Sequence, residues 1–219
     1  MLEEPGVLVV GSEVPNLLQP GVASTLVVSQ DVDLAVPVDR LQEVKRKLRE
    51  VQQLVPSKDE PSVLVPTSDA FIEANFLGLD SAIREFDETY VLEDPEMPLM
   101  VFGPLGHLRA GRIVEVEGTR VPLPRPAGLM IEKLLTDRTG DKGARDLLVV
   151  AGLLAVSSPA DVQELVADSR ALPAESRHAL RSNLTVLSLM QAQPGMPDPK
   201  PLRSAIADLL RELEALGDP

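Results

Sequence analysis

Proline is the feature that most limits how this chain can fold, because it ends helices and is excluded from the interior of sheets. The 219 residues include 20 prolines, two groups of which stand between otherwise regular segments. One group comprises Pro122, Pro124 and Pro126, and the other lies between residues 194 and 201. We take the first group as a domain boundary, which predicts a sheet-rich domain over residues 1–125 and a helical domain over residues 126–219.

Short apolar runs and alternating patterns predict strands in the first domain. An apolar run at residues 7–10 ends in a Gly-Ser turn, and residues 24–38 are rich in β-branched side chains that alternate with aspartates. Further strands are expected at residues 63–65, 90–92, 99–102, 112–116 and 119–121, the last two joined by a turn at Glu117-Gly118. Helices are expected at residues 39–55, with Asp39 as N-cap, and at residues 68–77.

Helical spacing dominates the second domain. Apolar residues recur at this spacing over residues 129–135 and 147–154, and a loop at residues 193–201 precedes a final helix at residues 202–216. The predicted fold class is therefore α/β of the α+β kind, with a mixed β-sheet flanked by helices and followed by a C-terminal helical region.

Composition excludes several kinds of chemistry. The chain has no cysteine, and its two histidines are far apart, which excludes thiolate catalysis and Cys-ligated zinc and argues against a His-based site. The net charge of −13 argues against a general basic surface for nucleic acid. The acidic start and the lack of a long apolar run lead us to expect a cytoplasmic protein that does not contact a membrane.

The Asp-x-Asp sequence at Asp31 and Asp33 is the main candidate for chemistry. On a strand, residues two apart share one face, so the two carboxylates could bind divalent cations together. The preceding Gly11-Ser12 turn could bring backbone amides and a hydroxyl close to phosphates. The alternative is a solvated strand edge that follows an ordinary turn.

A second group of charged residues lies at a predicted helix junction. Its basic members are Lys133, Arg138, Lys142 and Arg145. Cations gathered at such a junction could bind a triphosphate or an RNA backbone. The alternative is a solvated helix face neutralised by the acidic residues between them.

The order of these motifs resembles the nucleotidyltransferases of the DNA polymerase β superfamily. Gly-Ser, Asp-Val-Asp-Leu-Ala-Val, a β-rich stretch and Lys-Leu-Leu-x-x-Arg follow one another as in AbiEii-type and related minimal bacterial nucleotidyltransferases, and the match covers about the first two thirds of the chain. The resemblance implies a mixed sheet flanked by helices and a site for two Mg²⁺ ions. It also implies transfer of a nucleoside monophosphate from an NTP to an acceptor, which is tRNA in some toxin relatives.

The resemblance also assigns roles to particular residues. Asp31 and Asp33 would be the catalytic metal ligands, Gly11 and Ser12 would meet the NTP phosphates, and Lys133 would lie near the triphosphate or the acceptor. Arg145 and Lys142 match later family positions more loosely.

The family also places a third carboxylate on a later strand. The strand expected at residues 99–102 has only apolar side chains, so Glu115 or Glu117 is the candidate third metal ligand. With such a ligand the chain would be an active enzyme acting on RNA, a protein or a small molecule. Without it, the chain would be a degenerate nucleotidyltransferase fold that binds a nucleotide or a partner. A toxin role would imply an antitoxin as a protein partner.

Overall fold

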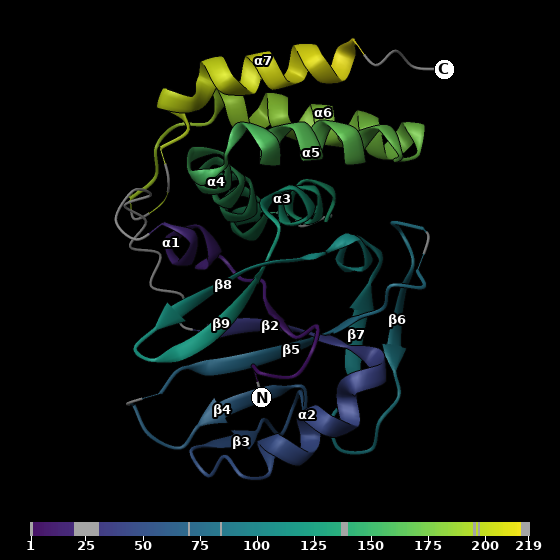
Figure 1. Cartoon of the computed structure of the whole chain (residues 1–219), viewed down its shortest axis with the longest axis vertical. Helices are drawn as coiled ribbons and strands as arrows, with labels where there is room; N and C mark the ends of the chain where they lie inside the picture. The colour runs from purple at the N-terminus through teal and green to yellow at the C-terminus, as the bar shows by residue number, and fades with distance from the viewer. Residues whose placement is uncertain are drawn as a thin grey trace. The chain divides into compact units, whose positions relative to one another are not determined.

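The computed structural model describes residues 2–19, 31–69, 71–83, 85–136, 140–194, 196 and 198–215, with only the backbone of residues 140–142. The chain divides into two compact units (Figure 1). The sheet unit comprises residues 1–13 and 29–124, and the helical unit comprises residues 14–28 and 125–219. The expected α+β class is confirmed, because a mixed sheet is combined with separate helices.

The main sheet of the sheet unit has seven strands within the described residues. They are β1 (Leu8–Val9), β2 (Asp31–Pro37), β3 (Leu54–Pro56), β4 (Val63–Pro66), β5 (Glu73–Leu79), β6 (Thr89–Leu92) and β7 (Leu99–Phe102). The order is β1-β2-β5-β4-β3, and β7 joins β5 to β6. Strands β2, β5 and β7 are parallel, whereas the other pairs are antiparallel.

The central position of β5 follows from its pairing on both edges. One edge is fully paired with β2, and the other is shared by β4 near Asn75 and by β7 near Gly78. Ala74, Phe76 and Gly78 are buried and alternate with half-buried residues. A Cβ at Gly78 would lie 2.5 Å from a methyl group of Val101, so glycine allows β5 and β7 to pack closely.

Two of the expected helices were wrong in whole or in part. Residues 68–77 were expected to be helical, but β5 begins at Glu73 and its backbone pairs with two strands. The helix expected at residues 39–55 ends much earlier: a 3₁₀ turn, η1 (Val38–Arg40), leads into α2 (Leu41–Leu48). Asp39 makes no side-chain cap, and the apolar residues that follow α2 form β3.

A separate β-hairpin completes the sheet unit. A 3₁₀ turn, η2 (Gly103–His107), precedes β8 (Ala110–Val116) and β9 (Thr119–Pro124), which pair antiparallel. The predicted turn at Glu117-Gly118 is confirmed, with φ of 49° and 79° at its two residues. Positive φ at both positions is typical of the two-residue turns that match strand twist.

The helical unit is built from amphipathic helices with a leucine-rich core. They are α1 (Val14–Leu18), α3 (Pro126–Leu135), α4 (Gly140–Val156), α5 (Pro159–Arg170), α6 (Ala174–Leu189), the 3₁₀ turn η3 (Lys200–Leu202) and α7 (Arg203–Glu214). The proline-rich link forms the end of β9 and the first turn of α3, where Pro126 costs no hydrogen bond. Ser158 and Asp161 form a capping box at the start of α5.

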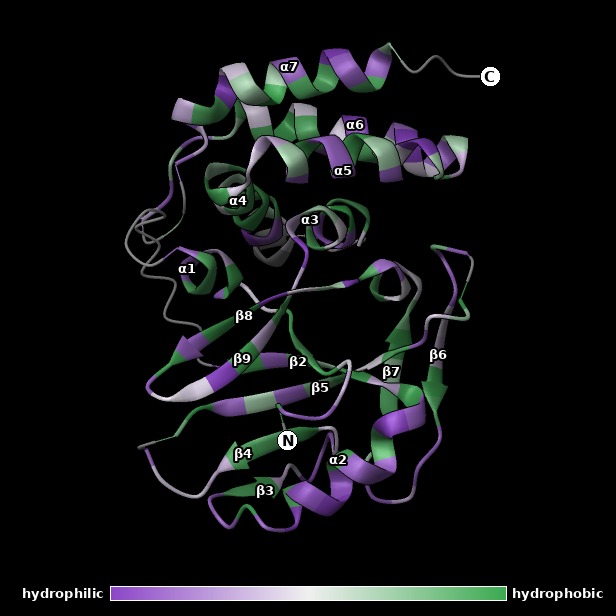
Figure 2. Ribbon diagram, in the orientation of Figure 1, coloured by the Kyte–Doolittle hydropathy of each residue, from purple (hydrophilic) through white to green (hydrophobic). Residues whose placement is uncertain are grey.

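Hydropathy distinguishes elements that pack on the core from those at the surface. Figure 2 shows β4 and β7 as largely hydrophobic and α2 as largely hydrophilic. In α2 only Leu41, Val44 and Lys45 are buried, so one narrow stripe packs against the sheet unit. The predicted strand segment at residues 24–30 and the predicted helix end at Leu216 lie outside the described residues.

Candidate functional site

Asp31 and Asp33 are the first polar pair of β2. They share one face because Val32 points to the opposite side of the strand. The next three residues, Leu34, Ala35 and Val36, are buried, whereas both aspartates are half-buried. The core therefore anchors the later part of the strand and leaves its acidic start accessible to solvent.

An amide from the neighbouring strand joins the two aspartates. Asn75 of β5 lies directly beside Asp33 in the parallel register. Its side-chain Nδ2 donates hydrogen bonds of 3.0 Å to Oδ2 of Asp31 and of 3.2 Å to Oδ1 of Asp33. The partial positive charge of the amide group thus offsets the repulsion between two adjacent carboxylates.

A further carboxylate lies on the same face of the sheet. Glu73 is in register with Asp31, and alternation along β5 places it on the side that carries Asn75. Because residues 68–77 were expected to form a helix, sequence analysis did not identify Glu73 as a neighbour of Asp31. The alternation of buried Ala74 and Phe76 with polar Glu73 and Asn75 is a period-two signal that favours a strand.

The oxygen atoms at this position have the chemistry that Mg²⁺ prefers. Beside the two carboxylates, Oδ1 of Asn75 is buried and accepts no hydrogen bond from the described part of the chain, while Nδ2 of the same amide faces the carboxylates. Carboxylate and amide oxygens are the usual protein ligands of hard divalent cations. Asp31 and Asp33 therefore supply two ligands that fit a Mg²⁺ ion, and Asn75 would add its oxygen as a third only with its amide turned about the Cβ–Cγ bond.

The Gly11-Ser12 turn follows β1 at the same end of β2. Strand β1 is antiparallel to β2, and the backbone amide of Val10 donates a 3.0 Å hydrogen bond to the carbonyl of Asp33. A Cβ at Gly11 would lie 2.3 Å from a carboxylate oxygen of Glu13, which folds back over the turn. Glycine lets the Glu13 carboxylate lie against this turn, and the turn lies beside the aspartates on the side of β2 away from β5.

The glutamates expected to supply a third carboxylate lie on the hairpin. Glu115 is exposed on β8 opposite Arg120, and Glu117 lies in the turn and not on a strand face. The hairpin is a sheet separate from the one that contains β2. Among the residues that the structure describes, no three acidic, histidine or cysteine side chains form a group that could hold a metal ion.

The basic residues predicted to bind nucleotide belong to the helical unit. Lys133 on α3 is buried, with its Nζ 3.1 Å from Oε2 of Glu132 and 3.6 Å from Oδ1 of Asp146 on α4. Two carboxylates therefore accompany the one ammonium group, and the cluster joins α3 to α4. Arg145 is exposed on α4, whereas Arg138 and the side chain of Lys142 lie outside the described residues.

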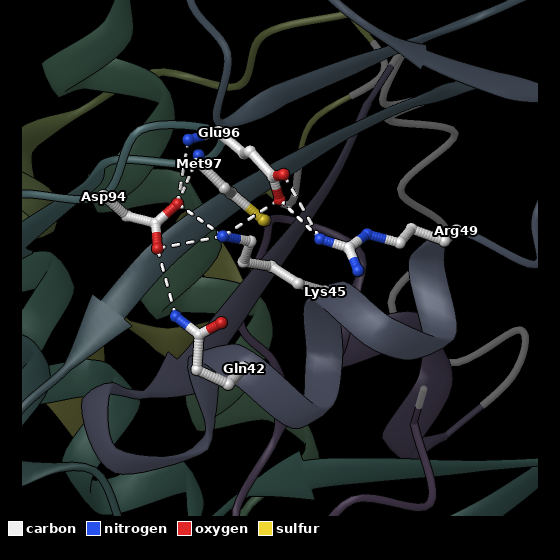
Figure 3. Close-up of polar contacts among 6 residues, drawn as sticks. All are labelled: Gln42, Lys45, Arg49, Asp94, Glu96 and Met97. Atoms are coloured by element: carbon white, nitrogen blue, oxygen red, sulfur yellow. Dashed lines mark hydrogen bonds and ion pairs between the residues drawn. The ribbon is translucent and has the colours of Figure 1, made fainter.

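The basic face of α2 forms a second charge cluster around the buried Lys45–Asp94 pair, which sequence analysis did not identify (Figure 3). Nζ of Lys45 lies 2.7 Å from Oδ1 of Asp94 and 3.0 Å from Oε2 of Glu96. Arg49 donates a hydrogen bond of 2.9 Å to Glu96, and Gln42 donates one of 3.1 Å to Asp94. We call these five residues the α2 clamp, because they hold α2 against the segment between β6 and β7.

Asp94 is the most strongly perturbed carboxyl group of the α2 clamp. Burial alone would raise its pKa, but hydrogen bonds from Lys45, from the backbone amides of Glu96 and Met97 and from Gln42 outweigh this effect and lower the pKa to about 2. The hydrogen bond to Asp94 in turn raises the pKa of Lys45 above its ordinary value. Both groups are therefore charged at neutral pH, and the clamp has a structural role.

Comparison with protein-family models gives no match, and comparison with curated proteins gives none either. No helix within the described residues is long and apolar enough to cross a membrane. The case for a function therefore rests on the geometry of this chain.

Proposed function

We propose that this chain is a Mg²⁺-dependent nucleotidyltransferase with the core fold of the DNA polymerase β superfamily, transferring a nucleoside monophosphate from an NTP to an acceptor hydroxyl. One observation carries the proposal: the register of β2 and β5 brings Asp31, Asp33, Glu73 and Asn75 to one face, beside the Gly11-Ser12 turn. This arrangement combines oxygen ligands for a cation with a glycine turn for phosphates.

Each residue of this face has a distinct role in the proposal. Asp31 and Asp33 would hold the metal through their carboxylates, and Asn75 would complete the protein ligands with its oxygen once its amide turns about the Cβ–Cγ bond. Bound Mg²⁺ would polarise the α-phosphate and neutralise charge on the leaving pyrophosphate. The Gly11 backbone and the Ser12 hydroxyl would bind the terminal phosphates after the Glu13 carboxylate moves away from the turn, and Glu73 would accept the proton of the acceptor hydroxyl.

A second candidate function is nucleotide binding without transfer. The observation that favours it is the amide at Asn75, because an amide can supply one neutral oxygen ligand but cannot accept a proton as a carboxylate does. If Glu73 does not take that role, the site binds Mg²⁺ and NTP without activating an acceptor. Only the first candidate function, nucleotidyl transfer, involves an acceptor such as tRNA, and only a transferase toxin would have an antitoxin as its protein partner.

One experiment separates the two candidates. Each α-labelled NTP is incubated with the native chain and with total RNA, protein or small-molecule pools, with Mg²⁺ or with EDTA. We expect label in one pool, lost with EDTA and lost in the Asp31→Asn/Asp33→Asn double variant, whereas Glu115→Gln on the hairpin keeps full activity.

Binding measured by equilibrium dialysis completes this test. Mg²⁺-dependent NTP binding that the double variant abolishes, without label transfer, would identify the non-catalytic function. A native chain that neither binds NTP nor transfers label would rule out both candidates.

A further inference from the structure

Phe71 and Ile72 form an exposed apolar pair at the edge of the acidic face, the face of the sheet that carries Asp31, Asp33 and Glu73. Phe71 is 47% exposed and Ile72 is 49% exposed, immediately before Glu73 begins β5. The chain has only four phenylalanines and one tyrosine, and the other four of these side chains are buried or half-buried. What distinguishes this pair from other exposed apolar side chains is its position next to the strand face that carries Asp31, Asp33 and Glu73.

The order of strands places this pair on a defined side of the aspartates. The Gly11-Ser12 turn follows β1 on one side of β2, and the Phe71-Ile72 pair precedes β5 on the other. Adjacent strands are about 4.8 Å apart, so β1 and β5 are separated by roughly 10 Å across the metal ligands. The turn and the apolar pair therefore flank Asp31 and Asp33.

Nucleotidyl transfer is an in-line displacement, in which the acceptor attacks from the side opposite the leaving pyrophosphate. If the Gly11-Ser12 turn binds the leaving phosphates, the acceptor enters from the side of β5. We propose that Phe71 and Ile72 dock the acceptor and that this acceptor is a basic polypeptide with a serine, threonine or tyrosine hydroxyl. The inference rests on the proposed function.

The charge of the residues near Phe71 and Ile72 indicates which class of acceptor fits this surface. Asp69 and Glu73 are the nearest carboxylates to the pair along the chain, Glu73 is in register with Asp31 on β2, and residues 59–83 contain no basic side chain. A nucleic acid needs cationic contacts for its phosphates, which this part of the chain does not supply. A polypeptide with apolar and lysine or arginine side chains is complementary to both the apolar pair and the acidic surroundings.

The covalent step balances without a further reactant. The acceptor oxygen forms a bond to the α-phosphorus while the bond from that phosphorus to the β-phosphate oxygen breaks. The products are a nucleotidylated side chain and pyrophosphate, and the hydroxyl proton passes to Glu73 and then to water.

The test uses the full chain with Mg²⁺, α-labelled NTPs and three acceptor probes. One is a peptide library with a single serine, threonine or tyrosine flanked by leucine and lysine, the second replaces lysine by glutamate, and the third is total tRNA. We expect transfer to the lysine library alone. The Phe71→Ala/Ile72→Ala variant should lower kcat/KM for the peptide about tenfold or more, mainly through KM, with an unchanged Kd for Mg²⁺·NTP.

A matched control separates docking from a general loss of surface apolarity. Val91→Ala removes a similarly exposed apolar side chain, 43% exposed on β6, and should leave the peptide KM unchanged. Thermal melts confirm that each variant is folded.

The outcomes distinguish this inference from the proposed function. Transfer to tRNA and not to peptide leaves the enzyme established and overturns the inference, as does peptide transfer that the Phe71→Ala/Ile72→Ala variant does not reduce. NTP binding without transfer to any probe assigns the non-catalytic function and overturns the inference. Failure of the native chain to bind Mg²⁺·NTP overturns both.

Discussion

At the scale of single residues, Asn75 stabilises the paired carboxylates of Asp31 and Asp33 when no cation is bound. Two carboxylates on one strand face repel each other, and the Nδ2 group of Asn75 contacts both. In a neighbouring position a third carboxylate would bind a cation more strongly but would add repulsion in its absence. The amide is thus compatible with a folded metal-free protein and with a weaker metal site.

Replacing this amide by a carboxylate should lower the stability of the metal-free protein and raise its affinity for Mg²⁺. In Asn75→Asp without divalent cation, we expect the free energy of unfolding to fall by about 1 kcal/mol or more, from like-charge repulsion at roughly 4 Å. Adding Mg²⁺ should raise the Tm of the variant by more than it raises the Tm of the native chain. Thermal unfolding with EDTA and across a Mg²⁺ series measures both effects.

The matched control is Gln52→Glu, which adds the same charge at an exposed position. A Mg²⁺-dependent rise in Tm that is no larger in Asn75→Asp than in Gln52→Glu would show that this face does not bind the cation.

At the scale of elements, the α2 clamp shows how a hydrophilic helix is held to a sheet unit. Helix α2 buries few apolar residues, and ion pairs supply further attachment: Lys45 and Arg49 contact Asp94 and Glu96, and Lys47 contacts Glu4. The Lys45–Asp94 pair carries most of this attachment, because the side chains are 10% and 7% exposed. Glu96 is more than half exposed, so solvent screens its pairs.

Removing the ammonium group should loosen α2. In Lys45→Met the carboxylate of Asp94 stays buried without its charged partner, which costs about 3 kcal/mol of unfolding free energy. Denaturant unfolding measures the loss, and Lys58→Met at an exposed position should change stability little. Equal effects of the two substitutions would contradict the structural role of the clamp.

The pH dependence of this loss has a definite sign. The pKa of Asp94 is lowered from 3.8 to about 2, so its contribution is complete above pH 3.8 and is lost as the pH falls towards 2. We expect the stability difference between the native chain and Lys45→Met to be constant near neutral pH and to shrink over this acidic window. Unfolding titrations between pH 2 and pH 6 would test it; a difference that persists at pH 2 would be inconsistent with this assignment.

At the scale of the whole molecule, the two units are not contiguous in sequence. Segment 14–28 belongs to the helical unit although it lies between β1 and β2, so the chain leaves the sheet unit and returns before β2 begins. Val14 at the start of α1 is fully buried, and α1 packs on α4 within the helical unit. A cut after residue 124 would therefore not separate complete domains.

This connectivity makes a prediction about where a core substitution acts. Val14→Ala should destabilise the helical unit by about 2 kcal/mol, because a buried side chain is shortened and leaves a cavity. In hydrogen exchange we expect faster exchange in α4 than in the native chain and unchanged protection in β5. Leu34→Ala in β2 should show the reverse pattern, and loss of β5 protection in Val14→Ala would contradict the division into units.

Local sequence determined the features that depend on short-range chemistry. The alternation at Asp31 and Asp33 was sufficient to place both carboxylates on one strand face, and Glu117-Gly118 was sufficient for the hairpin turn, because both follow from backbone geometry over a few residues. The same holds for the helical periodicity after Pro126 and for the overall α+β class. These predictions required no knowledge of which strands become neighbours.

Tertiary structure alone decided which residues meet across the sheet. Residues 51–56 and 73–79 have apolar spacings that fit a helix or a strand, and pairing with β4 and β2 selected the strand. Pairing of β5 with β2 places Glu73 and Asn75 beside the two aspartates. Burial beside Glu132 and Asp146 likewise gives Lys133 its carboxylate partners. Strand pairing and ion pairing join residues far apart in the chain, and their free energy depends on neighbours that no local pattern specifies.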